Sequence, residues 1–157
     1  MQDSPMQDSL TPLTHILDTE GLEAGLKWLN SRVPHRFTAI YKLVDQAMCS
    51  TAIVDKLYQA NVSDLAVVPL QDSFCQFAMN DGQFIAQNTG EDGDPRLKGH
   101  PYKGVLNSYV GLPLMINQRT MYGTLCHFDN SPIQLPDEEF EFLQHVAQLL
   151  PRYLTAQ

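Results

Sequence analysis

Two β-hairpin patterns, far apart in the sequence, constrain the fold most. The first pattern consists of two mainly apolar runs, residues 36–44 and 48–57, which a short polar connection joins. The second pattern joins residues 105–116 to residues 121–128 in the same way. Such runs, with polar positions alternating along them, are typical of antiparallel hairpins. The sequence therefore predicts an antiparallel sheet built largely from these two segments.

Helical patterns lie towards both ends of the chain, where apolar residues recur at spacings of three and four. Ser9 is expected to cap a first helix with Pro12 in its first turn, and Pro34 is expected to end a second. A closing helix opens at Asp137 with several carboxylates, and Pro151 should kink or end it. Helices at the ends and an antiparallel sheet between them predict an α+β fold.

Length and charge restrict the class of protein. The 157 residues suit a polar, flexible tail of residues 1–8 and a single domain of residues 9–157. A net charge of −8 argues against a nucleic-acid partner, because phosphates attract clustered Lys and Arg. No apolar run approaches the roughly 20 residues that span a bilayer, and the chain starts without a secretion signal. We therefore expect a cytoplasmic protein with no membrane partner.

Between the hairpins the sequence predicts two short strands and a long loop. Residues 73–79 and 83–88 have the composition of strands and flank a strong turn signal at residues 80–82. Residues 89–104 are the longest irregular stretch, with room for one short helix. Loops of this length are uncommon inside compact domains and tend to be functional.

Several short motifs follow one another in a characteristic order. They are Asp72-Ser73-Phe74-Cys75, Asn80-Asp81-Gly82, Asp94-Pro95-Arg96, the segment 108–114 and Tyr122-Gly123-Thr124-Leu125-Cys126. In this order they resemble the GAF domain family over residues 20–154. The resemblance implies a central antiparallel sheet of about five or six strands, with the N- and C-terminal helices packed on one face and a pocket on the other.

For function, the resemblance implies a sensory module that is not an enzyme. Its pocket would bind an unidentified small molecule, and its terminal helices would signal to a separate partner or a second subunit. The fold does not fix the ligand, which in such domains can be a cyclic nucleotide, a bilin, haem or a metabolite, so no cofactor or metal is assigned. The expected ligand-binding residues are Ser73, Phe74, Cys75, Phe77, Arg96, His100, Tyr109 and Gly111.

Two alternatives stay open: a dimerisation or scaffold domain with a vestigial pocket, and a redox enzyme. Free methionine sulfoxide reductases, relatives of this fold, carry a redox cysteine at the position that Cys75 resembles. They need a second thiol, whose position falls near Tyr102, and no cysteine lies between Cys75 and Cys126. Covalent bilin attachment meets the same objection, because the loop offers His100 but no thiol.

Other candidate residues have both a functional and a structural interpretation. Cys126 and His127 are neighbours on a predicted strand, so their side chains should point to opposite faces. His127 is either a structural histidine or a haem ligand. The guanidinium of Arg96 suits a carboxylate or a phosphate, but the charges of its loop also fit a solvated surface.

The closing helix has a broad apolar surface, which predicts a homodimer through the terminal helices. Its apolar residues are Phe140, Phe142, Leu143, Val146, Leu149, Leu150 and Tyr153.

Overall fold

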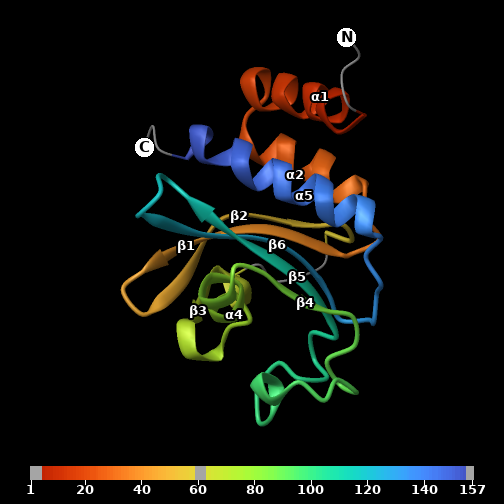
Figure 1. Ribbon diagram of the computed structural model, residues 1–157, viewed down its shortest axis with the longest axis vertical. Coiled ribbons are helices and arrows are strands. Elements are labelled where there is room, and N and C mark those ends of the chain that lie inside the picture. Colours follow the sequence, from red (N-terminus) through yellow and green to blue (C-terminus); the bar gives the residue numbers. More distant parts are fainter. Residues whose placement is uncertain (1–4, 59–62, 155–157) are drawn as a thin grey trace.

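The computed structural model describes residues 5–58 and 63–154, and its main elements form two helical groups around one sheet (Figure 1). In chain order they are α1 (Pro5–Thr19), α2 (Leu22–Ser31), β1 (Phe37–Val44), β2 (Ala47–Asp55), α3 (Ser63–Ala66), β3 (Val67–Pro69), α4 (Cys75–Asp81), β4 (Phe84–Ala86), β5 (Ser108–Met115), β6 (Met121–Asp129) and α5 (Asp137–Leu149). Helices α2 and α5 cover one face of the sheet, α1 packs on these two helices farther from the sheet, and α4 lies on the other face.

The sheet has six strands in the order β3-β2-β1-β6-β5-β4, and the paired strands run antiparallel. Both predicted hairpins are confirmed, as β1–β2 and β5–β6. Their inner strands pair at the centre of the sheet, where Thr38 lies opposite His127. The predicted α+β class is therefore correct: an antiparallel sheet of five or six strands was expected, with the terminal helices on one face, and the sheet has six.

The strand predicted over residues 73–79 is wrong, because this segment forms the helix α4. Its buried residues are Cys75 and Ala78, three positions apart as on one face of a helix, and Phe74 just before it is buried as well. The turn signal ends this helix: Gly82 has a positive φ of 85° and its N–H donates to the carbonyl of Ala78. A left-handed glycine after a helix is a common C-terminal cap.

The first helix begins earlier than its sequence pattern indicates. It starts at Pro5, so Ser9 does not cap it and Pro12 lies inside it rather than in its first turn. The predicted flexible tail covered residues 1–8, of which residues 1–4 lie outside the described part. At the other end the prediction is confirmed, since α5 ends at Leu149 and Pro151 lies in the 3₁₀ helix Leu150–Tyr153 that follows it.

The sheet separates two apolar clusters, because successive residues of a strand point to opposite faces. On the helical side, Leu112 and Leu125 pack with Phe142 and other residues of α1, α2 and α5. On the opposite side, Tyr109 and Cys126 pack with α4. The apolar breadth of α5 thus already has partners inside the chain, including α1, and the homodimer stays a prediction.

Candidate functional site

A small cavity lies on the sheet face that carries α4. Its volume is about 40 Å³. The residues around it come from β1, β2, β5 and β6, from the α3–β3 segment, from the start of α4 and from the loop before β5. They are Tyr41, Met48, Leu65, Val68, Ser73, Phe74, Cys75, Tyr102, Leu106, Tyr109, Cys126 and Phe128.

The lining is apolar and uncharged. None of these described residues is Asp, Glu, Lys, Arg or His, and the hydroxyl of Tyr41 donates to the carbonyl of Leu65 at 2.8 Å. Burial raises the pKa values of Tyr41 and Tyr109, so both phenols stay neutral. A charged molecule would lose its hydration here without gaining a counter-charge. The cavity therefore suits a small neutral molecule.

The main polar feature of the cavity is the sulfur of Cys75, which is nearly buried with 5% exposure. The hydroxyl of Thr124 donates to Sγ at 3.2 Å, and the hydroxyl of Tyr109 donates to it at 3.4 Å. The neighbouring Cys126 thiol and the hydrogen bonds from Thr124 and Tyr109 lower the pKa of Cys75, although burial opposes them. Two strands of the sheet thus direct polar hydrogens at one thiol.

Gly111 makes this arrangement possible without lining the cavity itself. It lies two residues after Tyr109 on β5, so both residues face the same side of the sheet. The ring of Tyr109 lies over Gly111, and a Cβ at that position would be 2.6 Å from Cε1 of the ring. A side chain at position 111 would therefore displace the phenol from Cys75.

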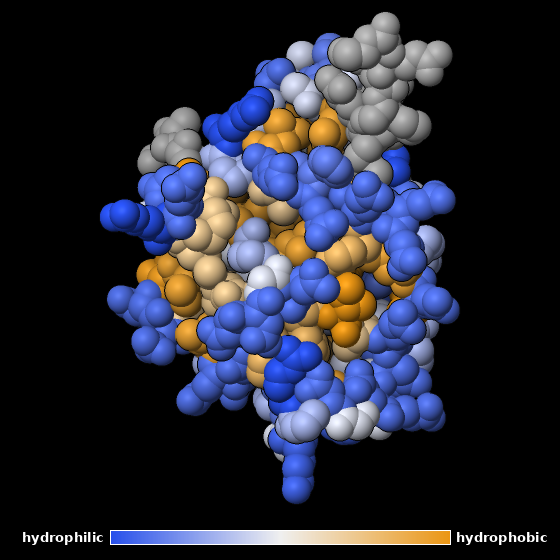
Figure 2. Space-filling model, viewed as in Figure 1, coloured by the Kyte–Doolittle hydropathy of each residue, from blue (hydrophilic) through white to orange (hydrophobic). Residues whose placement is uncertain are grey.

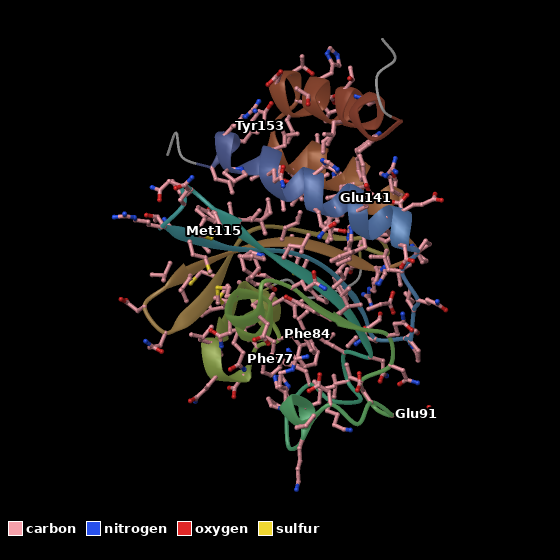
Figure 3. The ribbon with its side chains drawn as sticks, in the orientation of Figure 1. Phe77, Phe84, Glu91, Met115, Glu141 and Tyr153 are labelled. Atoms are coloured by element: carbon pink, nitrogen blue, oxygen red, sulfur yellow. The ribbon has the colours of Figure 1, made fainter. Side chains whose placement is uncertain are left out.

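Phe77 and His100 form an outer layer over the cavity wall. The His100 ring lies 4.5 Å from Phe74 between ring centroids and 5.7 Å from Phe77, and Phe77 packs on Phe84 (Figure 3). His100 Nε2 is 3.4 Å from the carbonyl oxygen of Ser73. Burial lowers the pKa of His100. Both residues support the cavity from outside and do not line it.

Arg96 fastens the long loop to α4. Its guanidinium pairs with Asp94 at 2.6 Å and with Asp81 at 2.5 Å, and it lies 4.7 Å from the ring centroid of Phe84. The carboxylates that this guanidinium meets belong to the chain itself. Figure 2 shows hydrophilic residues over this lower part of the molecule, where residues 89–104 lie, and apolar residues between it and the helices.

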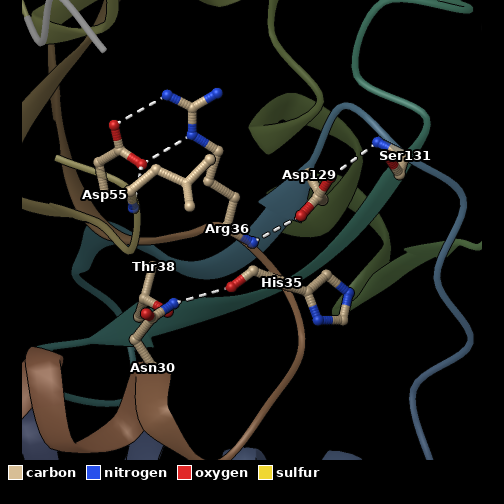
Figure 4. Close-up of polar contacts among 8 residues, drawn as sticks. Asn30, His35, Arg36, Thr38, Asp55, Asp129 and Ser131 are labelled. Carbon is tan, nitrogen blue, oxygen red and sulfur yellow. Dashed lines mark hydrogen bonds and ion pairs between the residues drawn. The ribbon is translucent and has the colours of Figure 1, made fainter. Parts of the chain in front are cut away.

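On the opposite face of the sheet, His127 belongs to a buried polar network, so the prediction that it points away from Cys126 is confirmed. Its Nδ1 is 2.6 Å from the Thr38 hydroxyl, and its ring stacks on His35 at 5.7 Å. Asn30 donates to that hydroxyl and to the His35 carbonyl (Figure 4). Burial lowers the pKa of His127 to about 3 and that of His35 to about 4. This geometry fits a structural histidine.

The structure therefore brings four of the eight expected residues to the cavity: Ser73, Phe74, Cys75 and Tyr109. Lining residues that the expectation missed include Tyr41 and Met48, on the first hairpin. The alternation of residues 36–44 had placed Tyr41 on one side of its strand, but the sequence alone did not show which side faces the cavity.

Within the described ranges, no three His, Cys, Asp or Glu side chains are grouped closely enough to hold a metal ion. None of the helices in the described part of the chain is both long and apolar enough to cross a membrane.

The GAF domain family model matches residues 15–152. The chain belongs to the GAF domain family. None of the curated proteins matches it. Domains of this family commonly bind small molecules in sensory proteins.

Solved structures, GAF domains among them, share the fold at low sequence identity. The GAF domain of an Acinetobacter phosphoenolpyruvate-protein phosphotransferase is 14% identical with a TM-score of 0.77, and the match covers 99% of this chain and 96% of that one. Free methionine-R-sulfoxide reductase from Neisseria meningitidis, in complex with its substrate, is 14% identical with a TM-score of 0.72, covering 99% and 94%.

A phycocyanobilin-bound GAF domain of a cyanobacterial phytochrome is 14% identical with a TM-score of 0.71, and the match covers 99% of this chain and 96% of that one. At such identities the likeness extends to the fold alone. The similar structures include a reductase and a domain of a phytochrome, so the role of this GAF domain has to be argued from its own residues.

Proposed function

We propose that this GAF domain is a sensory module that binds a small neutral molecule in the cavity beneath α4. One observation carries the proposal: the uncharged cavity between the sheet and α4, lined by Ser73, Phe74, Cys75 and Tyr109. A water molecule needs about 10–15 Å³ of such a volume. The ligand is therefore small, unless the loop before β5 moves outward when it binds.

The signal would pass through β5, because this strand contacts both layers. Tyr109 faces the cavity, whereas its neighbours Val110 and Leu112 pack in the cluster that contains α5. A ligand that shifts Tyr109 shifts the backbone of the same strand. The hydroxyl of Tyr153, just beyond α5, donates to Asp18 of α1 at 2.7 Å, so a movement of α5 also reaches α1. The output would be a change in how the terminal helices meet a partner protein or a second copy of the chain.

Native mass spectrometry of the full chain, purified from its own host, tests ligand binding. We expect a reproducible additional mass of a small neutral compound. Val68→Met should abolish it, because Val68 lines the cavity and the longer side chain fills the space. The matched control is Val54→Met, which adds the same volume in the cluster on the helical side. This control variant should keep the ligand.

Two results would contradict the proposal. Wild-type protein without any additional mass would favour a scaffold domain with a vestigial pocket. An additional mass that survives in Val68→Met would place the ligand elsewhere. Thermal melting of both variants checks that each folds, since overpacking a core typically costs about 1–3 kcal/mol.

We infer a cytoplasmic location from the cysteines, since Cys49, Cys75 and Cys126 are all free thiols. Disulfides are rare in reducing compartments. The proposed homodimer would form through the terminal helices. Sedimentation of the full chain tests it, and a monomer at tens of micromolar concentration would contradict it.

A further inference from the structure

Two cysteine thiols share the cavity. Cys75 is the first residue of α4, and Cys126 lies in the middle of β6; their exposed fractions are 5% and 0%. Cys49 is half-buried on β2 and is not among the lining residues. The fold thus brings together two thiols that are fifty-one positions apart (126 − 75) and leaves the third outside the cavity.

The sheet register places Cys126 between the groups that hold the sulfur of Cys75. Thr124, which donates to that sulfur at 3.2 Å, is two residues before Cys126 and faces the same side of β6. Gly111 is the direct cross-strand partner of Cys126, and the Tyr109 phenol, which donates at 3.4 Å, lies over Gly111. The two hydroxyls therefore flank Cys126 while both reach Cys75.

The two thiols have opposite electrostatic surroundings. Cys75 accepts hydrogen bonds from two hydroxyls, which stabilise a thiolate, and the neighbouring Cys126 thiol is the main cause that lowers its pKa. Burial raises the pKa of Cys126, whose Sγ points at the carbonyl of Ala39 at 3.7 Å. Cys75 is thus the stronger nucleophile, and Cys126 keeps its proton.

We propose that Cys75 and Cys126 form a reversible disulfide when hydrogen peroxide enters the cavity. The Cys75 sulfur attacks one peroxide oxygen, a sulfur–oxygen bond forms, the oxygen–oxygen bond breaks, and water leaves after protonation. The Cys126 sulfur then attacks Cys75; a sulfur–sulfur bond forms, and the hydroxyl of the sulfenic acid leaves as a second water with the Cys126 proton. Two thiols and one hydrogen peroxide give one disulfide and two waters.

The cavity selects for small oxidants. Its volume of about 40 Å³ can hold hydrogen peroxide, whereas an aromatic disulfide reagent is too large. Formation of the bond would draw the start of α4 towards β6 and take space from the cavity. The inference goes beyond ligand sensing and does not depend on it, because the test uses purified protein and no ligand.

The test treats the reduced, folded full chain with hydrogen peroxide, blocks the remaining thiols with an alkylating reagent in denaturant, and maps the peptides by mass spectrometry. We expect a Cys75–Cys126 cross-linked peptide, an alkylated Cys49 and full recovery of three thiols after reduction by a dithiol. Three alkylated cysteines after peroxide, or a disulfide that contains Cys49, would overturn the proposal.

Variants separate the two roles. Cys126→Ser should leave Cys75 as a sulfenic acid that dimedone labels once the oxidised protein is unfolded in denaturant, and Cys49→Ser should behave as wild type. Tyr109→Phe should slow oxidation about three- to tenfold, because it removes one donor to the sulfur. Tyr122→Phe is its matched control: this phenol is on the helical face and bonds to Thr51, so its loss should leave the rate unchanged. Equal rates in Tyr109→Phe and wild type would also overturn the assigned role of the phenol.

Discussion

Acid pH should destabilise this domain through the stacked pair of His35 and His127. Both are 1% exposed, and neither side chain gains a carboxylate partner among the described hydrogen bonds. Burial lowers the pKa of His35 from 6.5 to about 4 and that of His127 from 6.5 to about 3. The folded state therefore holds both rings neutral at a pH at which the unfolded chain already protonates them.

The sign and the size follow from this difference. Because the unfolded state takes up the protons first, stability is fully present above pH 6.5 and is lost as the pH falls towards 4 and 3. At pH 5 the unfolded state gains about 2 kcal/mol from each histidine, or about 4 kcal/mol from both, at about 1.4 kcal/mol per pH unit. That is a large part of the stability of a typical domain.

Urea unfolding at pH 7, 6 and 5 measures the effect, and His127→Asn isolates one member of the pair. Asparagine keeps a polar atom near the Thr38 hydroxyl but does not titrate. The variant is less stable than wild type at pH 7, yet its loss between pH 7 and pH 5 should be smaller by about 2 kcal/mol. His15→Asn, at an exposed position of α1, is the control and should show the wild-type pH dependence.

Equal pH dependence in wild type and His127→Asn would refute the reasoning. It would mean that His127 takes up its proton in the folded state as readily as in the unfolded one. If His15→Asn reduced the pH dependence of stability as much as His127→Asn does, the effect would come from the loss of any histidine and not from burial.

Three further predictions concern the sheet and the loop. Gly111→Ala should cost about 1–3 kcal/mol in urea unfolding, and Tyr109→Leu should relieve most of that cost in the double variant, because the added Cβ meets the Tyr109 ring. Gly123→Ala should cost more and should resist rescue, because there the Cβ meets the backbone of Tyr41. Arg96→Met should lower the free energy of unfolding by no more than about 1 kcal/mol, but it should speed amide hydrogen exchange across residues 92–104. Unchanged exchange would mean that other contacts hold this loop.

The strands of the sheet were predictable where two paired strands follow each other directly in the sequence. In the segments that became β1–β2 and β5–β6, each run lies next to its partner in the chain, so alternation and a short connection suffice. Residues 73–79 lack such a partner. Their seven positions satisfy both a strand and a helix, and only packing on the sheet and the left-handed Gly82 decide for the helix.

The site was predictable only in part, for a similar reason. Ser73, Phe74 and Tyr109 follow from the family resemblance, because a resemblance assigns residues by their order in the sequence. The stacking of His35 on His127 joins residues ninety-two positions apart (127 − 35), and no spacing in either segment signals it. The role of Gly111 was also missed, because this residue acts by having no side chain, which leaves space for the Tyr109 ring.

Successive residues of β6 point to opposite faces of the sheet, so a change on one face of this domain also affects the other. Cys126 lines the cavity, whereas its neighbour His127 packs beside Asn30 and Thr38 under the helices. A shift of the β6 backbone that accommodates a ligand or a disulfide at Cys126 therefore also moves His127 within a network of buried hydrogen bonds. Such networks tolerate little displacement, because an unmade buried hydrogen bond costs about 1–3 kcal/mol. Any change in the cavity that moves this strand must consequently reach the helical layer.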